Sequence, residues 1–441
     1  MCVKVSVKDF IKNVNTTLVT KEIQDAIDYC YLQGGGIVEF PKGVYPTGDI
    51  RIRSNITLLL RSGAILKGSR NIDDYFHHLD DQLEPYDYDQ IEPGCWGRID
   101  GVMRMMHKPG SRFHNSIIRG YNAENIAIIG EDDSYIDGCD CYDELGEEYY
   151  RGPHAIGLSN CKNILLKGYT NKNSGNWAHK IMWGQNIHVE DITVLGGHDG
   201  IHMRSCDDVH ILKSNFFTGD DCIAGFDNTN VLVEECELNS ACSALRFGGT
   251  NVLVQNCHMY GPAKYLFRGS LTKEEKITGA ESKKNIGGHR YNMLSVFTYF
   301  ADKSFAIRNI PGNIVIRNCK IENADRFIHY NFSGNEVWQK ASPLKDITFE
   351  NIEATGIRMP LNLYGDDSLR VTLKMKNVNV SFDETKNEPQ FINAANYDKI
   401  IFENVNSSSI CIKQWGETGI IESDRDFEII QASEPFQTGA I

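Results

Sequence analysis

The chain of 441 residues contains no run of 18 apolar residues, and its first ten residues lack the apolar core of a secretion signal. These two absences predict a protein without a membrane span, and we expect it in the cytoplasm. Basic residues are also scarce: 45 Lys and Arg stand against 59 Asp and Glu, for a net charge of −14. This balance argues against nucleic acid or an anionic membrane as the main partner.

No Cys-x-x-Cys pair occurs among the 13 cysteines, and Cys139-Asp140-Cys141 does not have the spacing of a zinc site. Several cysteines stand beside repeat segments, where a small buried side chain packs well: Cys206, Cys236, Cys257 and Cys319. An odd number of cysteines without paired spacing predicts reduced, buried thiols and neither disulfides nor a structural metal.

A repeat runs through most of the chain. The core of the repeat is Asn or Asp, followed by Ile or Val and then by alternating apolar positions. The clearest copies start at Asn163, Asn186, Asp208, Asn230 and Asn251, and weaker ones at Asn55, Asn125, Asn313, Asp346 and Lys399. Each copy predicts a short strand bounded by turn residues. Asn tolerates the left-handed backbone of a tight bend, and stacked Asn side chains can form ladders.

The clear copies follow one another at steps of 23, 22, 22 and 21 residues. A step near 22 accommodates three short strands and three turns, which is one coil of a right-handed parallel β-helix. The Leu-x-x-Leu-x-Leu pattern of leucine-rich repeats is absent, and a propeller repeats at about twice this interval. We therefore predict an all-β, single-stranded parallel β-helix (a pectin-lyase-like solenoid) that forms one domain over residues 1–441.

Three segments depart from the repeat. Residues 18–36 predict a cap: Ile23, Ala26, Ile27 and Tyr31 have helical spacing between Thr20 and Leu32, and three glycines then stop the helix. Such a helix would cover the open end of the solenoid. Residues 72–108 and 270–292 predict two excursions, which in a solenoid usually cluster on the binding face.

Three carboxylates recur at nearly the repeat interval. Asp199 lies in Gly-His-Asp-Gly-Ile, and Asp220 with Asp221 follows 21 residues later in Gly-Asp-Asp-Cys. A spacing of one coil predicts that Asp199 and Asp220 lie above one another. Crowded carboxylates repel, so one of them should hold a proton near neutral pH. An acid beside a base is what glycoside hydrolysis requires.

The chain resembles glycoside hydrolase family 28, the polygalacturonases, from about residue 20 to residue 410. Gly197-His198-Asp199-Gly200 and Gly219-Asp220-Asp221 align with that family's two acidic motifs. The opening is also similar, and the matching stretches are Ile23-Gln24-Asp25-Ala26-Ile27, Gly34-Gly35-Gly36, Phe40-Pro41, Asn55-Ile56-Thr57-Leu58 and Gly63-Ala64.

The resemblance implies an inverting glycosidase that needs no cofactor. Asp220 would protonate the leaving oxygen, while Asp199 and Asp221 would activate water from the other face of the sugar. Inversion leaves room for that water, so acid and base should stand roughly 6.5–9.5 Å apart.

The chain departs from the family at two motifs. Where the family has Gly-His-Gly, the matching stretch is Ser240 to Arg246, without a His. Where the family has Arg-Ile-Lys, the region reads Lys264-Tyr265-Leu266-Phe267-Arg268. These departures predict an exo-acting enzyme on short oligosaccharides rather than a typical polygalacturonase.

Six further residues are candidates for substrate contact: His198, His202, Arg246, Arg268, Trp177 and Arg204. The two histidines flank Asp199, the Arg246–Arg268 spacing of 22 suggests stacked cations, and Trp177 lies one coil before Asp199. The alternatives are a surface His on a turn, salt bridges to the acids, and a Trp buried under a loop. No third ligand is set by spacing beside the histidines, so we predict no metal site.

Two other functions remain open for this pattern. A polysaccharide lyase or sugar epimerase on the same fold would use a basic residue, and three acids could bind calcium for it. A carbohydrate-binding solenoid without activity would agree with the altered motifs, although a binder has no need to crowd like charges. We expect a carbohydrate partner in all these cases, and the sequence does not indicate an oligomeric state.

Overall fold

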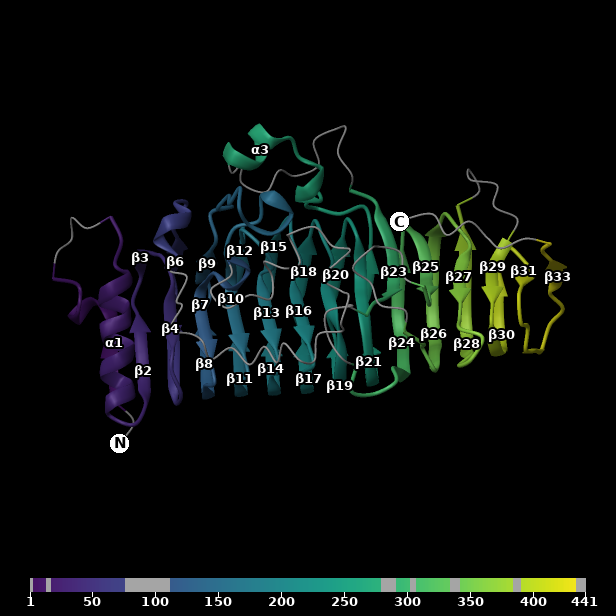
Figure 1. Ribbon diagram of the computed structural model, residues 1–441, viewed down its shortest axis with the longest axis horizontal. Helices are drawn as coiled ribbons and strands as arrows, with labels where there is room; N and C mark the ends of the chain where they lie inside the picture. The colour runs from purple at the N-terminus through teal and green to yellow at the C-terminus, as the bar shows by residue number, and fades with distance from the viewer. Residues whose placement is uncertain are drawn as a thin grey trace.

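The strands of the computed structural model stand side by side in one long row, with helix α1 (Thr20–Leu32) at the N-terminal end (Figure 1). The structure describes residues 3–12, 17–75, 112–278, 291–301, 307–333, 342–383 and 390–433. Every pairing between named strands in these ranges is parallel, for example β14 (Gln185–Glu190) with β17 (Asp207–Leu212). The predicted all-β parallel β-helix is confirmed.

Three parallel sheets form the sides of the solenoid. The first sheet consists of β4 Ile50–Ile52, β7 Ser116–Tyr121, β10 His154–Ser159, β13 His179–Met182, β16 Ile201–Arg204, β19 Ile223–Glu234, β21 Ser243–Gln255, β23 Met293–Tyr299, β25 Ala324–Asn331, β27 Leu361–Tyr364, β29 Gln390–Ala395, β31 Cys411–Trp415 and β33 Glu428–Gln431.

The second sheet consists of β1 Val3–Ser6, β2 Gly36–Phe40, β5 Ile56–Leu60, β8 Glu124–Gly130, β11 Lys162–Lys167, β14, β17, β24 Gly312–Glu322, β26 Asp346–Ile357, β28 Val371–Phe382, β30 Tyr397–Ser407 and β32 Ile420–Ser423. Strands β19 and β21 continue into this sheet from the first. The third sheet consists of β3 Gly43–Thr47, β6 Ala64–Gly68, β9 Tyr135–Asp137, β12 Thr170–Lys172, β15 Thr193–Gly196, β18 Asn215–Thr218, β20 Glu237–Ser240 and β22 His258–Tyr260, followed by the second halves of β24, β26, β28 and β30.

The core is one continuous column of apolar side chains inside the three sheets. Ile187 pairs with Val209, which pairs with Val231, so equivalent positions recur every 22 residues and the same apolar type stacks on itself. All three are buried, whereas the alternating neighbours of each strand face outward. This alternation is the period-2 pattern that predicted the strands.

A ladder of Asn side chains runs along one corner. Asn163 donates from Nδ2 to Oδ1 of Asn125 at 2.8 Å, and Asn186 donates to Asn163 at 2.9 Å. Both Asn163 and Asn186 have φ of 53°, a left-handed conformation that Asn adopts at low cost. Asp208 takes the next position and accepts from Asn230 at 3.0 Å. The predicted ladder is therefore confirmed.

The N-terminal cap is also confirmed. Ile23, Ala26 and Ile27 are buried against the first coils. Tyr31, expected on the same face, is 45% exposed, because the regular i, i+3, i+4, i+7 stripe of Ile23, Ala26 and Ile27 continues through the fully buried Cys30. Gly34 then adopts a φ of +91°, which ends the helix as predicted.

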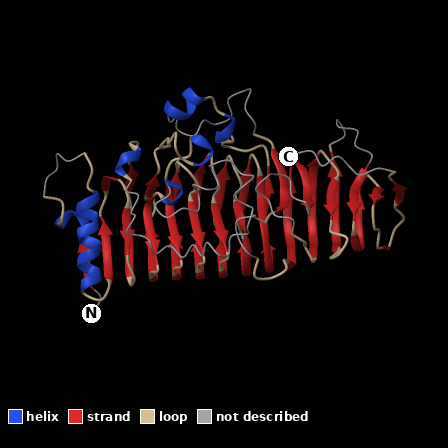
Figure 2. Ribbon diagram, in the orientation of Figure 1, coloured by secondary structure: helices blue, strands red, loops and turns tan. Residues whose placement is uncertain are grey.

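Short helical turns lie above the strands near the middle of the solenoid (Figure 2). They are η6 (Glu147–Tyr149) in the loop between β9 and β10, η7 (Arg268–Ser270), and α3 (Lys273–Thr278), which lies in the predicted excursion 270–292. Residues 76–108 and 279–290 of the expected excursions lie outside the described residues. The two short helical segments η2 (Ile72–Asp74) and η5 (Arg112–His114) mark the edges of the first excursion, and η1 (Val7–Asp9) precedes the cap.

All 11 cysteines in the described ranges are free thiols, and ten of them are buried. This agrees with the prediction of reduced cysteines. Among the helices of the same ranges, none has both the length and the apolar character needed to cross a membrane.

Candidate active site

Asp199, Asp221 and Ser243 occupy equivalent positions on three consecutive coils, at the entrance to β16, β19 and β21. Backbone hydrogen bonds fix this register: Gly200 N donates to Asp221 O at 2.9 Å, and Cys222 N donates to Ser243 O at 3.0 Å. The predicted stacking of Asp199 on Asp220 is therefore wrong by one residue. The coil is 22 residues long at this point, since Ile201 pairs with Ile223.

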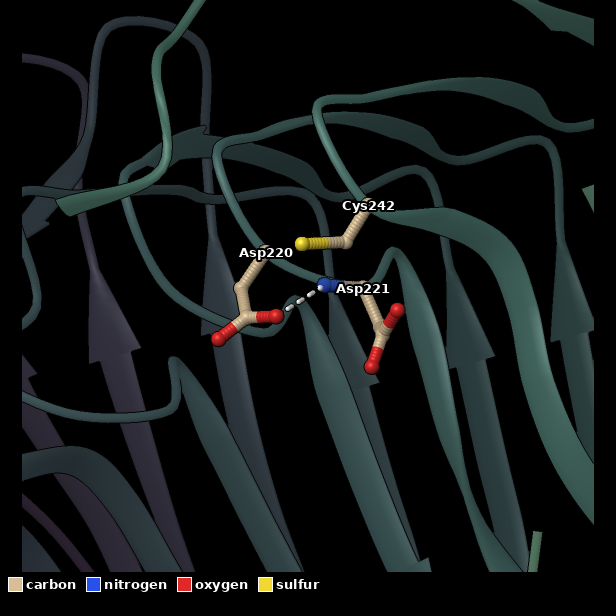
Figure 3. A group of neighbouring side chains, drawn as sticks. All are labelled: Asp220, Asp221 and Cys242. Carbon is tan, nitrogen blue, oxygen red and sulfur yellow. Dashed lines mark hydrogen bonds between the residues drawn. The ribbon is translucent and has the colours of Figure 1, made fainter. Parts of the chain in front are cut away.

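Asp220 and Asp221 lie in the turn between β18 and β19, which lets both carboxylates leave the ribbon on the same side (Figure 3). The turn is held by the Asp220 carbonyl, which accepts from Thr218 Oγ1 and from Ser240 Oγ, each at 2.6 Å. Gly219 is required here, because a Cβ at this position would lie 1.9 Å from the Leu266 carbonyl oxygen. The close approach of the Leu266 carbonyl thus explains why the motif begins with glycine.

The three carboxylates are almost fully buried: Asp199 is 4% exposed, Asp220 7% and Asp221 2%. Burial, and then the neighbouring Asp220 charge, raise the pKa of Asp221 to about 7. Burial and the charges of Asp220 and Asp221 raise the pKa of Asp199 well above its usual range. The group therefore retains a proton near neutral pH, as the crowding of charges predicted.

Two arginines balance the remaining charge. Arg151 donates from Nη2 to Asp220 Oδ2 at 3.1 Å, and both side chains are buried. Arg246 Nη1 lies 3.7 Å from Asp221 Oδ2, and its guanidinium sits 4.5 Å above the Phe300 ring. The side chain of Arg246 is 20% exposed, more than the carboxylates themselves. An anionic or hydroxyl-rich ligand beside the acids can reach this guanidinium.

The thiol of Cys242 points toward the turn that carries Asp220 and Asp221 (Figure 3). Its sulfur and one oxygen of each carboxylate all lie within 4.8 Å of one another. In the described part of the chain, this is the closest approach to a metal-ligand group. Arg151 and Arg246 already supply positive charge to both carboxylates, so the arrangement favours an acid–base site over a cation site.

His202 and Trp177 meet face to face beside Asp199. Their rings lie 3.7 Å apart at an angle of 8°. His202 Nδ1 lies 2.7 Å from Asp199 Oδ2, and Arg204 Nε donates to His202 Nε2 at 3.2 Å. Trp177, His202 and Arg204 are all buried. The structure therefore places these three candidates around an acid, and His202 covers one face of the Trp177 ring.

His198 lies on the other side, at the position equivalent to Asp220 one coil earlier. Its ring stacks on Tyr150 at 5.8 Å and 25°, and its Nε2 lies 3.5 Å from Arg268 Nη1. Arg268 is buried in an ion pair with Asp140, at 3.1 Å between Nη1 and Oδ1. His198 Nδ1 and the Tyr150 hydroxyl are buried without a hydrogen-bond partner among the described residues.

The expected stacking of Arg246 and Arg268 does not occur. Arg246 pairs with Thr298 on the next coil, whereas Arg268 belongs to the excursion between β22 and β23. The spacing of 22 failed as a guide here because the chain leaves the coil after Tyr260 and returns only at Met293. Arg246 therefore lies beside Asp221, whereas Arg268 pairs with Asp140.

Sequence reasoning missed Arg151 and Tyr150. Both directly follow η6, outside any repeat copy, and 69 residues separate Arg151 from its partner Asp220. No repeat spacing in the sequence connects Arg151 with Asp220. The loop that carries Arg151 contains an isolated antiparallel bridge between Tyr142 and Arg151. Cys242 was predictable as a site residue, because it follows Asp220 by 22 residues, which is one coil.

Comparisons with known proteins agree with this architecture. Residues 99–243 match the model of the family described as glycosyl hydrolases family 28. A probable polygalacturonase of Vitis vinifera is 28% identical over 221 residues, which are 47% of this chain and 41% of that protein. An exo-poly-alpha-D-galacturonosidase of Dickeya chrysanthemi is 27% identical over 262 residues, covering 48% of this chain and 40% of that protein.

The fold matches over nearly the whole chain. The solved structure of a family 28 exopolygalacturonase of Yersinia enterocolitica aligns with a TM-score of 0.62 and 19% identity, over 98% of this chain and 77% of that one. By sequence, the chain spans about two fifths of the length of the two curated relatives. The sequence match extends up to Ser243, so it includes all three buried acids.

Proposed function

We propose that this chain, which belongs to glycosyl hydrolase family 28, is an inverting glycosidase that removes terminal sugars from short oligosaccharides. One observation carries the proposal: three buried carboxylates meet at one point of the first sheet, and the pKa of one of them is about 7. Burying three like charges costs stability, and acid–base catalysis at neutral pH explains that cost.

We assign the role of general acid to Asp220, which would protonate the leaving oxygen. Asp199 and Asp221 would together accept the proton of the attacking water. One oxygen of Asp220 and one oxygen of Asp221 lie within 4.8 Å of each other, which is short of the roughly 6.5–9.5 Å expected between acid and base, so that expectation is not confirmed for this pair. Inversion requires that the water reaches the sugar from the face opposite to Asp220. The residues supply both proton transfers, and the reaction requires no cofactor.

The contact with Arg151 adds a requirement to this mechanism. The buried guanidinium of Arg151 lies 3.1 Å from Asp220, whereas a general acid must hold a proton when the leaving oxygen departs. The three carboxylates are coupled, so their proton belongs to the group. We infer that the proton rests on Asp199 or Asp221 in the free enzyme, and moves to Asp220 when the leaving oxygen enters.

Exo action is supported by the way two segments close over the acids. Arg151, which follows η6, contacts Asp220, and Lys276 of α3 lies 4.2 Å above the Tyr150 ring. The Gly219 position also approaches the Leu266 carbonyl closely. Such enclosure suits a chain end better than the middle of a polymer. The eleven free thiols fit a reducing compartment, and we propose the cytoplasm as the location.

The test is hydrolysis of a panel of aryl glycosides and short plant and host oligosaccharides by the wild type and by Asp220→Asn. Asp208→Asn is the matched control, because it makes the same substitution at an exposed ladder position on the same coil. We expect release of one sugar by the wild type and the control, and a loss of about 100-fold or more in Asp220→Asn. Proton NMR of the first-formed anomer then tests inversion.

Other outcomes point to the other functions. A product absorbing in the ultraviolet, lost on chelation, indicates a lyase. Sugar binding by the folded wild type without turnover across the panel indicates a binding solenoid. Retention of the anomeric configuration rejects the inverting mechanism while keeping the glycosidase.

A further inference from the structure

We propose that Arg204 and His202 act as a positioning pair that presents an Nδ1–H group to Asp199 and holds this carboxylate in place as the proton acceptor. The inference rests on the proposed function for its catalytic meaning. Its structural content stands on three contacts: Arg204 to His202 at 3.2 Å, His202 to Asp199 at 2.7 Å, and the stack of His202 on Trp177 at 3.7 Å.

The tautomer of His202 follows from the chemistry of its neighbours. The guanidinium of Arg204 has donors only, so the Nε2 atom it contacts must offer a lone pair. A neutral imidazole with a lone pair on Nε2 carries its hydrogen on Nδ1, and Nδ1 faces Asp199 Oδ2. His202 is therefore neutral and donates to Asp199.

Packing prevents the ring from leaving this orientation. Trp177 covers one face at an angle of 8°, and Phe300 meets the ring edge-on at 6.2 Å. Rotating the ring by half a turn would place carbon atoms at both contacts and lose both hydrogen bonds. Arg204 is fixed in turn, because its guanidinium lies 5.3 Å from the Trp177 ring and 5.6 Å from the Phe226 ring.

The electrostatic surroundings agree with a neutral His202. Burial, followed by the charge of Arg204, lowers the pKa of His202 well below its usual range. The charged and titratable groups that face this pair are Asp220 and Asp221 from the turn before β19, Arg246 from β21, Arg151, and His154 from β10.

The consequence concerns Asp199. Burial and two neighbouring carboxylates raise the pKa of Asp199, and a hydrogen bond from Nδ1–H opposes this by stabilising the ionised form. The bond also occupies Oδ2 and leaves Oδ1 as the atom for water. Trp177 would then act by orienting the histidine, not by stacking on a sugar.

The first test needs no substrate. The full chain is labelled with ¹⁵N-histidine, and the His202 signals are assigned by their loss in His202→Asn. We expect nitrogen shifts of a neutral ring with hydrogen on Nδ1, unchanged between pH 5 and pH 8. In Arg204→Met, Nε2 loses its donor, and the Nε2–H or the doubly protonated form should appear in this range. A charged His202 at pH 7 in the wild type, or a hydrogen on Nε2, overturns the proposal.

The second test separates positioning from simple support of the fold. His202→Phe keeps a ring on Trp177 but removes the donor, whereas His202→Asn keeps a donor at the place of Nδ1. With the glycoside selected by the panel, we expect kcat in His202→Phe to fall about 100-fold and in His202→Asn by less than about 10-fold. The acidic limb of kcat/KM should move upward by about one pH unit in His202→Phe only.

Equal losses in both variants with unmoved pH profiles would show a merely structural role. If the panel yields no substrate, the upward shift of the Asp199 pKa in His202→Phe is measured directly by ¹³C NMR of the Asp199 carboxyl. Asp199→Asn serves to assign the signal. A failure of the glycosidase proposal is thereby distinguished from a failure of this one.

Discussion

Arg151 and Asp220 form a buried ion pair at 3.1 Å, although 69 residues separate them in the chain. The pair joins a loop before β10 to the turn before β19. It places a fixed positive charge against the carboxylate to which we assign the leaving-group proton.

Replacing Arg151 by Met should shift the pH profile of activity. The charge of Arg151 lowers the raised pKa of Asp199, so without the guanidinium the carboxylate group holds its proton more tightly, and the alkaline limb of kcat should move to higher pH. The variant should also lose about 3 kcal/mol of unfolding free energy at pH 8, because a buried charge is left without its partner. Arg151→Lys keeps the charge and is the control. An alkaline limb that stays in place in Arg151→Met would argue against Asp220 as the acid.

Asp221→Asn should abolish activity and yet stabilise the protein at alkaline pH. The pKa of Asp221 is about 7 in the folded state and near the usual value when unfolded, so the folded state binds more protons between these values. Stability consequently decreases between about pH 4 and pH 7, by roughly 4 kcal/mol in total, and this contribution levels off above pH 7. Urea unfolding at pH 4 and pH 8 measures this. The advantage of the variant should appear at pH 8 and be absent at pH 4; a variant that is less stable at pH 8 contradicts the prediction.

A buried histidine inside the solenoid should make the fold sensitive to acid. His179 Nδ1 donates to the Gly200 carbonyl at 2.9 Å, and His179 Nε2 accepts from the Tyr169 hydroxyl at 2.8 Å. Burial lowers its pKa to about 4. Because the unfolded state takes up this proton first, stability falls as pH drops below about 6.5, by roughly 2 kcal/mol at pH 5.

The measurement is thermal unfolding at pH 7 and pH 5 for the wild type, His179→Gln and Tyr169→Phe. His179→Gln should lose this part of the pH dependence. Tyr169→Phe removes a hydrogen bond but keeps the titrating ring, so its slope should persist. Identical slopes in the wild type and His179→Gln would show that other groups cause the acid sensitivity.

Gly219→Ala should disrupt the acidic turn by direct overlap. The added Cβ would lie 1.9 Å from the Leu266 carbonyl, and backbone cannot give way as a side-chain tip can. We expect a loss of about 3 kcal/mol or more, together with loss of activity. Gly34→Ala is the contrasting variant: its Cβ meets nothing within 4 Å, but its φ is +91°. Strain alone should cost about 1 kcal/mol there and leave activity intact.

Much of the fold was predictable because it depends on local repetition. The copies at Asn163 and Asn186 carry their own strand pattern and turn residue, and their spacing gives the coil length. The cap helix was predicted for the same reason, whereas Tyr31 was misplaced because the buried stripe of the helix runs through Cys30. The candidate acids were recognisable since Gly219 and the two following Asp residues form one contiguous motif.

Contacts that cross the repeat were not predictable. Arg246 and Arg268 have the spacing of one coil, but the excursion between them breaks the relation between spacing and stacking. The partner of Asp220 comes from a loop with no periodic pattern. The assignment of Asp199 to the row of Asp221 needed the register of β16 against β19, which a shift of one residue reverses.

By itself, the sequence determined the coil length, the alternation that fills the core, the cap, and the three carboxylates brought to one region. These features are encoded in short, repeated patterns whose geometry is local. Only the tertiary structure decided which acid pairs with Arg151, which atom of His202 faces Asp199, and what the candidate arginines contact. These contacts depend on loops that pack over the coil. Burial and neighbouring charges, some of them distant in sequence, then shift the pKa values of Asp199 and Asp221.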